Sequence, residues 1–376
     1  WEICKAESLF RNITDKNHPD DTVLTIVQGK GTLPRDKSGR NIHYDDASLS
    51  NYKRVEKGDF IIHLRSFEGG LEMAHETGIV SPAYTILRCS KPHSSLFYEA
   101  YFHTDEFINH VLSKAVEGIR DGRQISYEAF KWLGIPYCAN AEQEKISALF
   151  EAINRRIEKQ EQIVNALKKY KRGLQNRFFF KHSQLSPKDS EIDSRDVKPL
   201  GSVVHINPKT GSLPEAFIYI DLECVESGIL NRKKLISRNS APSRAQRLLE
   251  EGDLLYQMVR PYQKNNYYFK KGFEYPTVAS TGYAQIRCSE MDTQFIYEQL
   301  SSDYFAHEAM LRSTGTGYPA INADDLAEIP IWVPPLDQQE KIGAALSFLG
   351  EKIEAHQKLL SALCCVKSSL LQQLFI

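Results

Sequence analysis

The sequence contains few of the patterns that a metalloprotein, a secreted protein or a membrane protein needs. Its seven cysteines form no Cys-x-x-Cys pair and are odd in number, so we expect neither a zinc site nor a disulfide framework. The eleven histidines show no metal-ligand spacing. No apolar run is long enough to span a membrane, and no signal peptide is recognisable. These absences favour a cytoplasmic protein; because the chain opens on Trp1 rather than Met, we expect its natural N-terminus to lie upstream.

Catalytic signatures are missing as well. No Gly-rich dinucleotide fingerprint and no P-loop occurs. The Asn/Asp-Pro-Pro-aromatic motif of DNA amino-methyltransferases is absent, and Asn207-Pro208-Lys209 does not match it. A nuclease of the common type has Pro-Asp followed by Glu-x-Lys; Pro19-Asp20 is present, but Glu-x-Lys occurs nowhere. The sequence therefore predicts a chain without its own catalytic site.

The charge of the chain is balanced. Lys and Arg number 47 and Asp and Glu number 48, which gives a net charge of -1. Any nucleic-acid surface must therefore be a local patch. With 376 residues, 41% of them hydrophobic, the chain is long enough for two globular domains and additional helices.

Two long runs, residues 142–179 and 338–375, repeat each other at an offset of 196 residues. They open on Gln143-Glu144-Lys145-Ile146 and on Gln339-Glu340-Lys341-Ile342. They close on a Lys, a Leu and a Phe at matched places: Lys171, Leu174 and Phe179, then Lys367, Leu370 and Phe375. An ungapped repeat of this length indicates an internal duplication.

Apolar residues in both runs follow a heptad pattern. In the first run the two series are Ile146, Ile153, Gln160, Leu167 and Leu174, then Phe150, Ile157, Val164, Lys171 and Phe178. The second run holds Ile342, Leu349, His356, Leu363 and Leu370, then Leu346, Ile353, Leu360, Lys367 and Leu374. This spacing predicts two coiled-coil helices, which most simply pack on each other antiparallel. A single long solvated helix in an ordinary α protein is the alternative.

The segments between the runs also match. Ser81-Pro-Ala-Tyr-Thr-Ile-Leu-Arg-Cys89 corresponds to Ser280-Thr-Gly-Tyr-Ala-Gln-Ile-Arg-Cys288, and Gly58-Asp59 corresponds to Gly252-Asp253. We expect strands at residues 22–27, 60–64, 85–89 and 254–258, and helices at 96–114 and 295–311. The predicted fold class is α+β, with two similar mixed α/β domains and two antiparallel helices in a pseudo-twofold tandem repeat. The predicted segments are domain 1 at 1–136, helix 1 at 137–182, a linker at 183–199, domain 2 at 200–335 and helix 2 at 336–376.

The length of the heptad run has a geometric consequence. From Ile146 to Phe178 the helix would extend about 48 Å at about 1.5 Å per residue, and one turn of B-DNA is about 34 Å. We therefore expect the two domains to face two sites roughly one turn apart on a duplex.

In these motifs the chain resembles the specificity (S) subunits of type I restriction-modification systems. The resemblance covers nearly the whole chain and rests on the following motifs: Gly58-Asp59 with Arg65, Gly78-Ile-Val-Ser-Pro-Ala-Tyr84, the Gly-rich loop before Ile125, Ile135-Pro136, Pro334-Pro-Leu-Asp-Gln-Gln-Glu-Lys-Ile342 and Ser369-Leu-Leu-Gln-Gln-Leu-Phe375. The chain departs from the pattern at the first junction, which lacks the second proline, and at Ser280-Thr281-Gly282.

The resemblance implies two target recognition domains that each read half of a bipartite, asymmetric double-stranded DNA sequence. It also implies that the helices dock two methyltransferase (M) subunits and that restriction (R) subunits join them. S-adenosylmethionine, ATP and magnesium would then belong to the partner subunits, and this chain would hold no cofactor. A stand-alone DNA-binding or scaffold protein without partners is the alternative, and a fused endonuclease is a third, disfavoured by the missing Glu-x-Lys.

Candidate DNA contacts are basic or amide side chains on loops, because phosphates attract Lys and Arg and base edges pair with Arg, Asn, Gln or Lys. In domain 1 they are Lys30, Arg35, Lys37, Arg40, His63, Arg65, Arg120 and Arg123. In domain 2 they are Arg232, Lys233, Lys234, Arg238, Arg244, Arg247, Gln257, Arg260, Lys264, Asn265, Asn266 and Tyr318. Some of these charges, Arg232-Lys-Lys234 above all, could equally be a solvated turn. Tyr84 and Tyr283 fit the core better, and the two Gly-Asp turns fit a structural role with Gly at positive φ.

The outward faces of the helices carry charges that could either solubilise them or dock partners. These charges are Glu151, Arg155, Arg156, Glu158, Lys159, Glu161, Lys168 and Lys169. Docking would be supported by exposed apolar residues off the heptad seam, for which the candidates are Tyr170, Phe179, Phe180, Leu359 and Val366.

Overall fold

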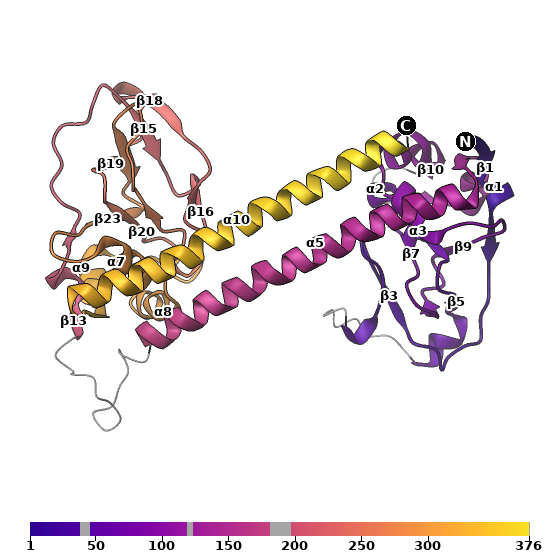
Figure 1. The fold of residues 1–376 in the computed structure, drawn as a ribbon, viewed down its shortest axis with the longest axis horizontal. Helices are drawn as coiled ribbons and strands as arrows, with labels where there is room; N and C mark the ends of the chain where they lie inside the picture. The colour runs from indigo at the N-terminus through magenta and orange to yellow at the C-terminus, as the bar shows by residue number, and fades with distance from the viewer. Residues whose placement is uncertain (38–45, 119–122, 181–196, 376) are drawn as a thin grey trace. The chain divides into compact units, whose positions relative to one another are not determined.

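The structure is a computed structural model that describes residues 1–37, 46–118, 123–180 and 197–375 (Figure 1). The chain divides into two compact units. Unit 1 consists of residues 1–161 and 358–376, and unit 2 consists of residues 162–357. Each unit combines antiparallel β-sheet with short helices, as the predicted fold class requires.

Unit 1 is built on a four-stranded antiparallel sheet of order β2-β9-β6-β7. Its strands are β1 (Glu2–Lys5), β2 (Phe10–Ile13), β3 (Leu24–Val27), β4 (Gly31–Pro34), β5 (Lys53–Val55), β6 (Phe60–Ile62), β7 (Glu72–Met73), β8 (Gly78–Val80), β9 (Thr85–Cys89), β10 (Val116–Glu117), β11 (Gln124–Ile125) and β12 (Gly134–Tyr137). Its short helices are α1 (Ala6–Leu9), α2 (Ser66–Gly69), α3 (Ser95–Phe102) and α4 (Tyr127–Phe130), with a π-helix at Glu106–Val111. β3 and β4 form a hairpin, β5 pairs with β8, and a single parallel bridge joins Val23 to Ile79.

Unit 2 repeats this plan. Its strands are β13 (Val197–Pro199), β14 (His205–Ile206), β15 (Ala216–Ile220), β16 (Val225–Glu226), β17 (Ile229–Leu230), β18 (Lys234–Ser237), β19 (Ala245–Leu248), β20 (Leu254–Gln257), β21 (Tyr267–Tyr268), β22 (Thr277–Ser280), β23 (Tyr283–Arg287) and β24 (Pro330–Trp332). Its helices are α7 (Thr293–Leu300), α8 (Asp303–Leu311) and α9 (Ala323–Ala327), with the 3-10 helix η10 at Pro261–Gln263.

The strand orders confirm the duplication. The sheet β14-β23-β20-β21 of unit 2 corresponds to β2-β9-β6-β7 of unit 1. The second sheet, β18-β15-β22-β19, contains one parallel pair, β15 with β22, and corresponds to β4, β3, β8 and β5. The predicted strand at residues 85–89 is β9, and the other predicted strands are confirmed within two residues. The predicted helix at 295–311 is instead two helices, because Ser302 ends α7 and caps α8 through its hydroxyl.

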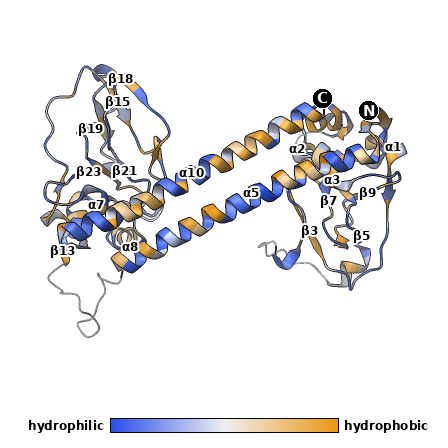
Figure 2. Ribbon diagram, in the orientation of Figure 1, coloured by the Kyte–Doolittle hydropathy of each residue, from blue (hydrophilic) through white to orange (hydrophobic). Residues whose placement is uncertain are grey.

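Both heptad runs are single long helices. α5 (Asn140–Gln175) has 36 residues and α10 (Leu336–Leu374) has 39. In unit 1, Phe150 near the start of α5 shares a core with Leu370 and Phe375 at the end of α10. In unit 2, Leu174 near the end of α5 shares a core with Leu346 near the start of α10. The helices therefore run antiparallel, as predicted, and apolar residues alternate with polar ones along both (Figure 2).

Burial confirms the predicted seam, because every heptad position of both runs is buried or half-buried. Outside the seam, Tyr170, Leu359 and Val366 are exposed, as expected for a docking face. The prediction that Phe179 is exposed was wrong. Its ring is fully buried in the core of unit 2, with its centroid 5.6 Å from that of Phe295. The side chain of Phe180 lies outside the described residues.

The repeated Gln at the opening of each helix has a structural cause. Gln143 is buried, accepts a hydrogen bond from the backbone N–H of Ser94 at 3.0 Å and donates to the carbonyl of Cys138 at 2.9 Å. Gln339 makes the matching contacts in unit 2, at 3.0 and 2.7 Å. Each glutamine thus joins the start of its long helix to the segment before α3 or α7.

Candidate nucleic-acid interface

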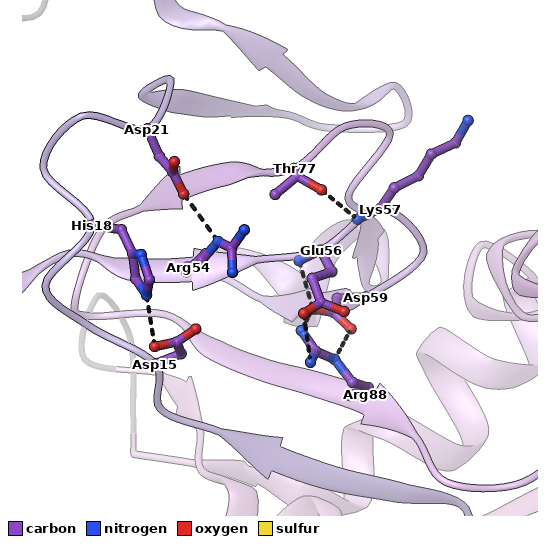
Figure 3. Close-up of polar contacts among 9 residues, drawn as sticks. All are labelled: Asp15, His18, Asp21, Arg54, Glu56, Lys57, Asp59, Thr77 and Arg88. Carbon is purple, nitrogen blue, oxygen red and sulfur yellow. Dashed lines mark hydrogen bonds and ion pairs between the residues drawn. The ribbon is translucent and has the colours of Figure 1, made fainter.

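A buried aspartate anchors the turn before the central strand of unit 1. Asp59 accepts two hydrogen bonds from Arg88 at 2.7 and 2.8 Å, and its Oδ2 also accepts the N–H of Glu56 at 2.8 Å (Figure 3). These hydrogen bonds to Asp59 raise the pKa of Arg88. Gly58 has a φ of 94°, which a residue with a Cβ rarely adopts. The predicted structural role of this turn is confirmed.

The same anchor recurs in unit 2, with one more partner. Asp253 accepts hydrogen bonds from Arg287 at 2.8 and 2.9 Å and from the N–H of Glu250 at 2.7 Å. The side-chain amide of Gln285 adds a further hydrogen bond at 2.7 Å. Gly252 has a φ of 96°. Both anchors hold the start of a central strand, β6 or β20, whose far end carries the candidate DNA contacts.

In unit 1 the segment after β6, which we call the β6 turn (residues 63–70), gathers two of the predicted contacts. Arg65 is exposed at the start of α2. The guanidinium carbon of Arg123 lies 4.2 Å from the ring centroid of Phe67, and its Nη2 lies 4.0 Å from the carboxylate of Glu68. Arg123, which directly precedes β11, thus contacts two residues of the β6 turn.

A buried carboxylate holds the β3–β4 hairpin, whose tip carries the exposed Lys30. Glu72 is fully buried and accepts hydrogen bonds from the N–H groups of Gly29 at 2.6 Å and Gly31 at 2.8 Å. His103 Nε2 lies 3.3 Å from the same carboxylate. Burial alone would raise the pKa of Glu72, but these contacts lower it below its usual value. Burial would likewise lower the pKa of His103, but the Glu72 carboxylate raises it.

This pair predicts a pH dependence that is confined to unit 1. Glu72 stabilises the hairpin above its unfolded pKa of about 4.3, and His103 does so below its unfolded pKa of about 6.5. Protection of the hairpin should therefore be greatest between these values and should fall as pH rises through the raised pKa of His103. Hydrogen exchange of residues 24–34 at several pH values measures it. Glu72→Gln should flatten the profile above pH 6.5, and an unchanged profile in that variant would contradict the assignment.

The remaining described candidates of unit 1 have different surroundings. Lys37 is exposed, and Arg35 is half-buried with its Nε 3.4 Å from the hydroxyl of Thr25. His63 is half-buried, which lowers its pKa, and its Nδ1 accepts the N–H of Arg65 at 3.3 Å. Arg40 and Arg120 lie outside the described residues.

In unit 2 the segment from Gln257 to Asn266, which we call the β20 turn, is held by its own amides. Gln257 is buried; it donates to the carbonyl of Val259 at 2.8 Å and accepts the N–H of Asn265 at 3.0 Å. Asn266 is also buried and accepts the N–H of Gln257 at 2.9 Å. The side-chain amides of both residues thus form hydrogen bonds within the turn. Lys264 forms an ion pair with Asp303.

Arg260 and Tyr318 come together at the outer side of the β20 turn. The guanidinium carbon of Arg260 lies 4.2 Å from the centroid of the Tyr318 ring. The backbone N–H of Arg260 donates to the carbonyl of Pro319 at 2.7 Å. The second Gly-rich loop (residues 313–321) is thus fastened to the turn after the central strand.

The other basic candidates of unit 2 surround the second sheet. Arg232 and Arg244 are exposed, and Lys233 lies 3.9 Å from the ring centroid of Phe273. Lys234 is paired with Asp221 at 2.6 Å, and Arg238 donates to backbone carbonyls. Arg247 is half-buried. Within the Arg232-Lys-Lys234 run, the charge of Lys234 is thus neutralised by Asp221.

The sequence pattern did not indicate Phe67, Glu72, Arg88 or Arg287 as part of either site. The sequence could have indicated the two arginines, because both belong to the Arg-Cys motif that occurs once in each repeat. Within the part of the chain that the structure describes, no group of three or more His, Cys, Asp or Glu is arranged to hold a metal ion. No helix among those residues is long and apolar enough to cross a membrane.

Comparison with known proteins gives one consistent result. The family model of the type I restriction modification DNA specificity domain matches residues 196–363. The specificity subunit of the type I restriction enzyme MjaVIII from Methanocaldococcus jannaschii is 23% identical over 253 residues. That match covers 62% of this chain and 59% of the relative, so it spans less than two thirds of the relative's length.

Solved structures share the fold over the full chain. The S subunit of a type I restriction-modification system from M. genitalium superimposes with a TM-score of 0.61 at 18% identity, and the match covers 100% of this chain and 96% of that one. A chain from a structure of type I R-M complex assembly and conformational transition matches with a TM-score of 0.54 at 16% identity, covering 100% and 97%.

Proposed function

We propose that this chain is a specificity subunit of a type I restriction-modification system and that it selects the bipartite DNA sequence on which its partner subunits act, because residues 196–363 match the DNA specificity domain of such systems. The observation that carries the proposal is the repeated site. In both units a buried aspartate anchors the central strand, and a cation–π contact joins the turn that follows this strand to a distant residue, Arg123 in unit 1 and Tyr318 in unit 2. Because the side chains on the two turns differ, each unit would read a different half-site.

The partners follow from the same proposal. Two methyltransferase subunits would dock on the long helices, where Tyr170, Leu359 and Val366 leave apolar surface exposed, and restriction subunits would join them. S-adenosylmethionine, ATP and magnesium would act on those subunits. This chain would bind and orient DNA without supplying a catalytic group.

Two measurements test the proposal. The full chain, co-expressed with a methyltransferase subunit from its host, should co-purify with that subunit and should enrich one bipartite sequence from a randomised duplex library. A chain that enriches a sequence without retaining any methyltransferase would instead be a stand-alone DNA-binding protein. Failure to enrich any sequence would refute the proposal.

The long helices are also expected to set the spacer between half-sites. One heptad inserted into each helix adds about 10 Å at about 1.5 Å per residue while keeping the seam in register. We expect the selected spacer to lengthen by roughly three base pairs, at 3.4 Å per pair. Sequencing of the DNA selected by this variant measures the change, and an unchanged spacer would contradict the role of the helices.

A further inference from the structure

Each unit contains a cation–π contact at the turn after its central strand, and the cation and the ring exchange places between the two units. In unit 1 the ring, Phe67, lies on the turn and the cation, Arg123, directly precedes β11. In unit 2 the cation, Arg260, lies on the turn and the ring, Tyr318, lies on the loop. The distance from guanidinium carbon to ring centroid is 4.2 Å in both.

The backbone of unit 2 holds its arginine in an unusual conformation. Arg260 has a φ of 55° and a ψ of 56°, in the left-handed region that residues other than glycine rarely occupy. A bridge between Val259 and Ala320 flanks it, and the N–H of Ile321 donates to the carbonyl of Met258 at 3.1 Å. Such conformations persist where the surroundings fix them, and they cluster at ligand sites.

The charge of Arg260 is not neutralised by any residue that the structure describes. Among the described residues no carboxylate forms an ion pair with Arg260, and its Nε is buried without a hydrogen-bond partner. Arg123 in unit 1 has Glu68 at 4.0 Å, and Lys264 in the same turn as Arg260 is held by Asp303. The ring beneath Arg260 is 70% exposed, so this stacked pair faces solvent.

We propose that Arg260 reads a guanine in the half-site of unit 2 and that Tyr318 positions it. A guanidinium stacked on a ring keeps its donor edge free, and that edge matches the O6 and N7 acceptors of guanine in the major groove. Stacking on the Tyr318 ring orients the plane of the Arg260 guanidinium before DNA binds. This inference rests on the proposed function, because it assumes that the chain reads DNA.

The test is selection from a duplex library, with randomised positions, by the full chain assembled with its methyltransferase subunits. We expect Arg260→Lys, which keeps the charge but loses the fork, to lower discrimination at one G·C pair by roughly 5- to 150-fold. Tyr318→Ala should relax the same pair, Tyr318→Phe should keep it within about twofold, and the other half-site should be unchanged.

Other outcomes overturn the inference in distinguishable ways. If Arg260→Lys weakens binding to all sequences equally, Arg260 contacts a phosphate; if every G·C preference survives in both Arg260→Lys and Tyr318→Ala, the pair reads no base. Thermal unfolding of each variant controls for loss of fold. If Arg260→Lys proves unstable, Tyr318→Ala still tests the inference, because it changes an exposed side chain. A wild-type chain that selects no sequence would refute the proposed function itself.

Discussion

A chimaera that takes residues 1–135 from another family member is expected to read a new first half-site and to keep the second. The reason is that unit 1 and unit 2 are separate compact units whose sheets, in the part of the chain that the structure describes, share no strand, so each unit would carry its own half-site reader. Even two mismatched base pairs cost about 2–6 kcal/mol, so binding to the original sequence should fall roughly 30- to 20,000-fold.

The exchange must preserve the contacts between domain and helix. Trp1, Phe97 and Tyr101 all pack on Phe375, with ring centroids 5.9, 5.2 and 5.5 Å from it. A donor with aromatic residues at these places should keep unit 1 folded. The same donor with alanine at the place of Phe97 is the matched control, because it changes stability without changing the loops.

Sequencing of DNA selected by the chimaera and by the parent measures the outcome. The parental second half-site should be retained unchanged. If both half-sites changed, or if the first stayed parental, sequence reading could not be divided between the two units.

The helical part of the fold could be predicted from the sequence because its signal is periodic. A heptad pattern is recognised from the spacing of its apolar residues alone. A polar residue at a heptad position, such as Lys171, is still accommodated, because its ammonium lies 2.9 Å from the carboxylate of Glu298. The strands and the duplication were likewise visible as matched motifs. Phe179 was misjudged because it follows the seam directly, where the chain turns its ring into the core of unit 2.

The candidate site was less predictable, because residue type does not say where an amide or a cation is directed. Gln257 and Asn266 have the chemistry of base readers, but the β20 turn uses them for its own hydrogen bonds. The pairing of Arg260 with Tyr318 joins residues 58 positions apart and has no sequence signature. In unit 1 the ring lies on the turn and the cation lies away from it, which is the reverse of unit 2. An alignment of the two repeats therefore does not pair Arg123 with Arg260 or Phe67 with Tyr318.

Replacing Asp253 with alanine is expected to destabilise unit 2 by about 3 kcal/mol or more. The change leaves the Arg287 guanidinium without its buried acceptor, and the N–H of Glu250 and the amide of Gln285 also lose theirs. Asp59→Ala is the matched variant in unit 1. Asp59 has no counterpart of the Gln285 contact, so its loss should cost less by about 1 kcal/mol, the net contribution of one hydrogen bond.

Hydrogen exchange under native conditions can follow both units in one molecule, because peptides from β6 and β20 report separately. Glu250→Ala and Glu56→Ala remove only the exposed partners of the two arginines and should each cost under about 1 kcal/mol. Equal losses for Asp253→Ala and Glu250→Ala would show that the buried carboxylate does not anchor β20. Since Gln257 ends β20 and Arg260 follows it, loosening this strand should also weaken sequence selection in the half-site of unit 2 alone.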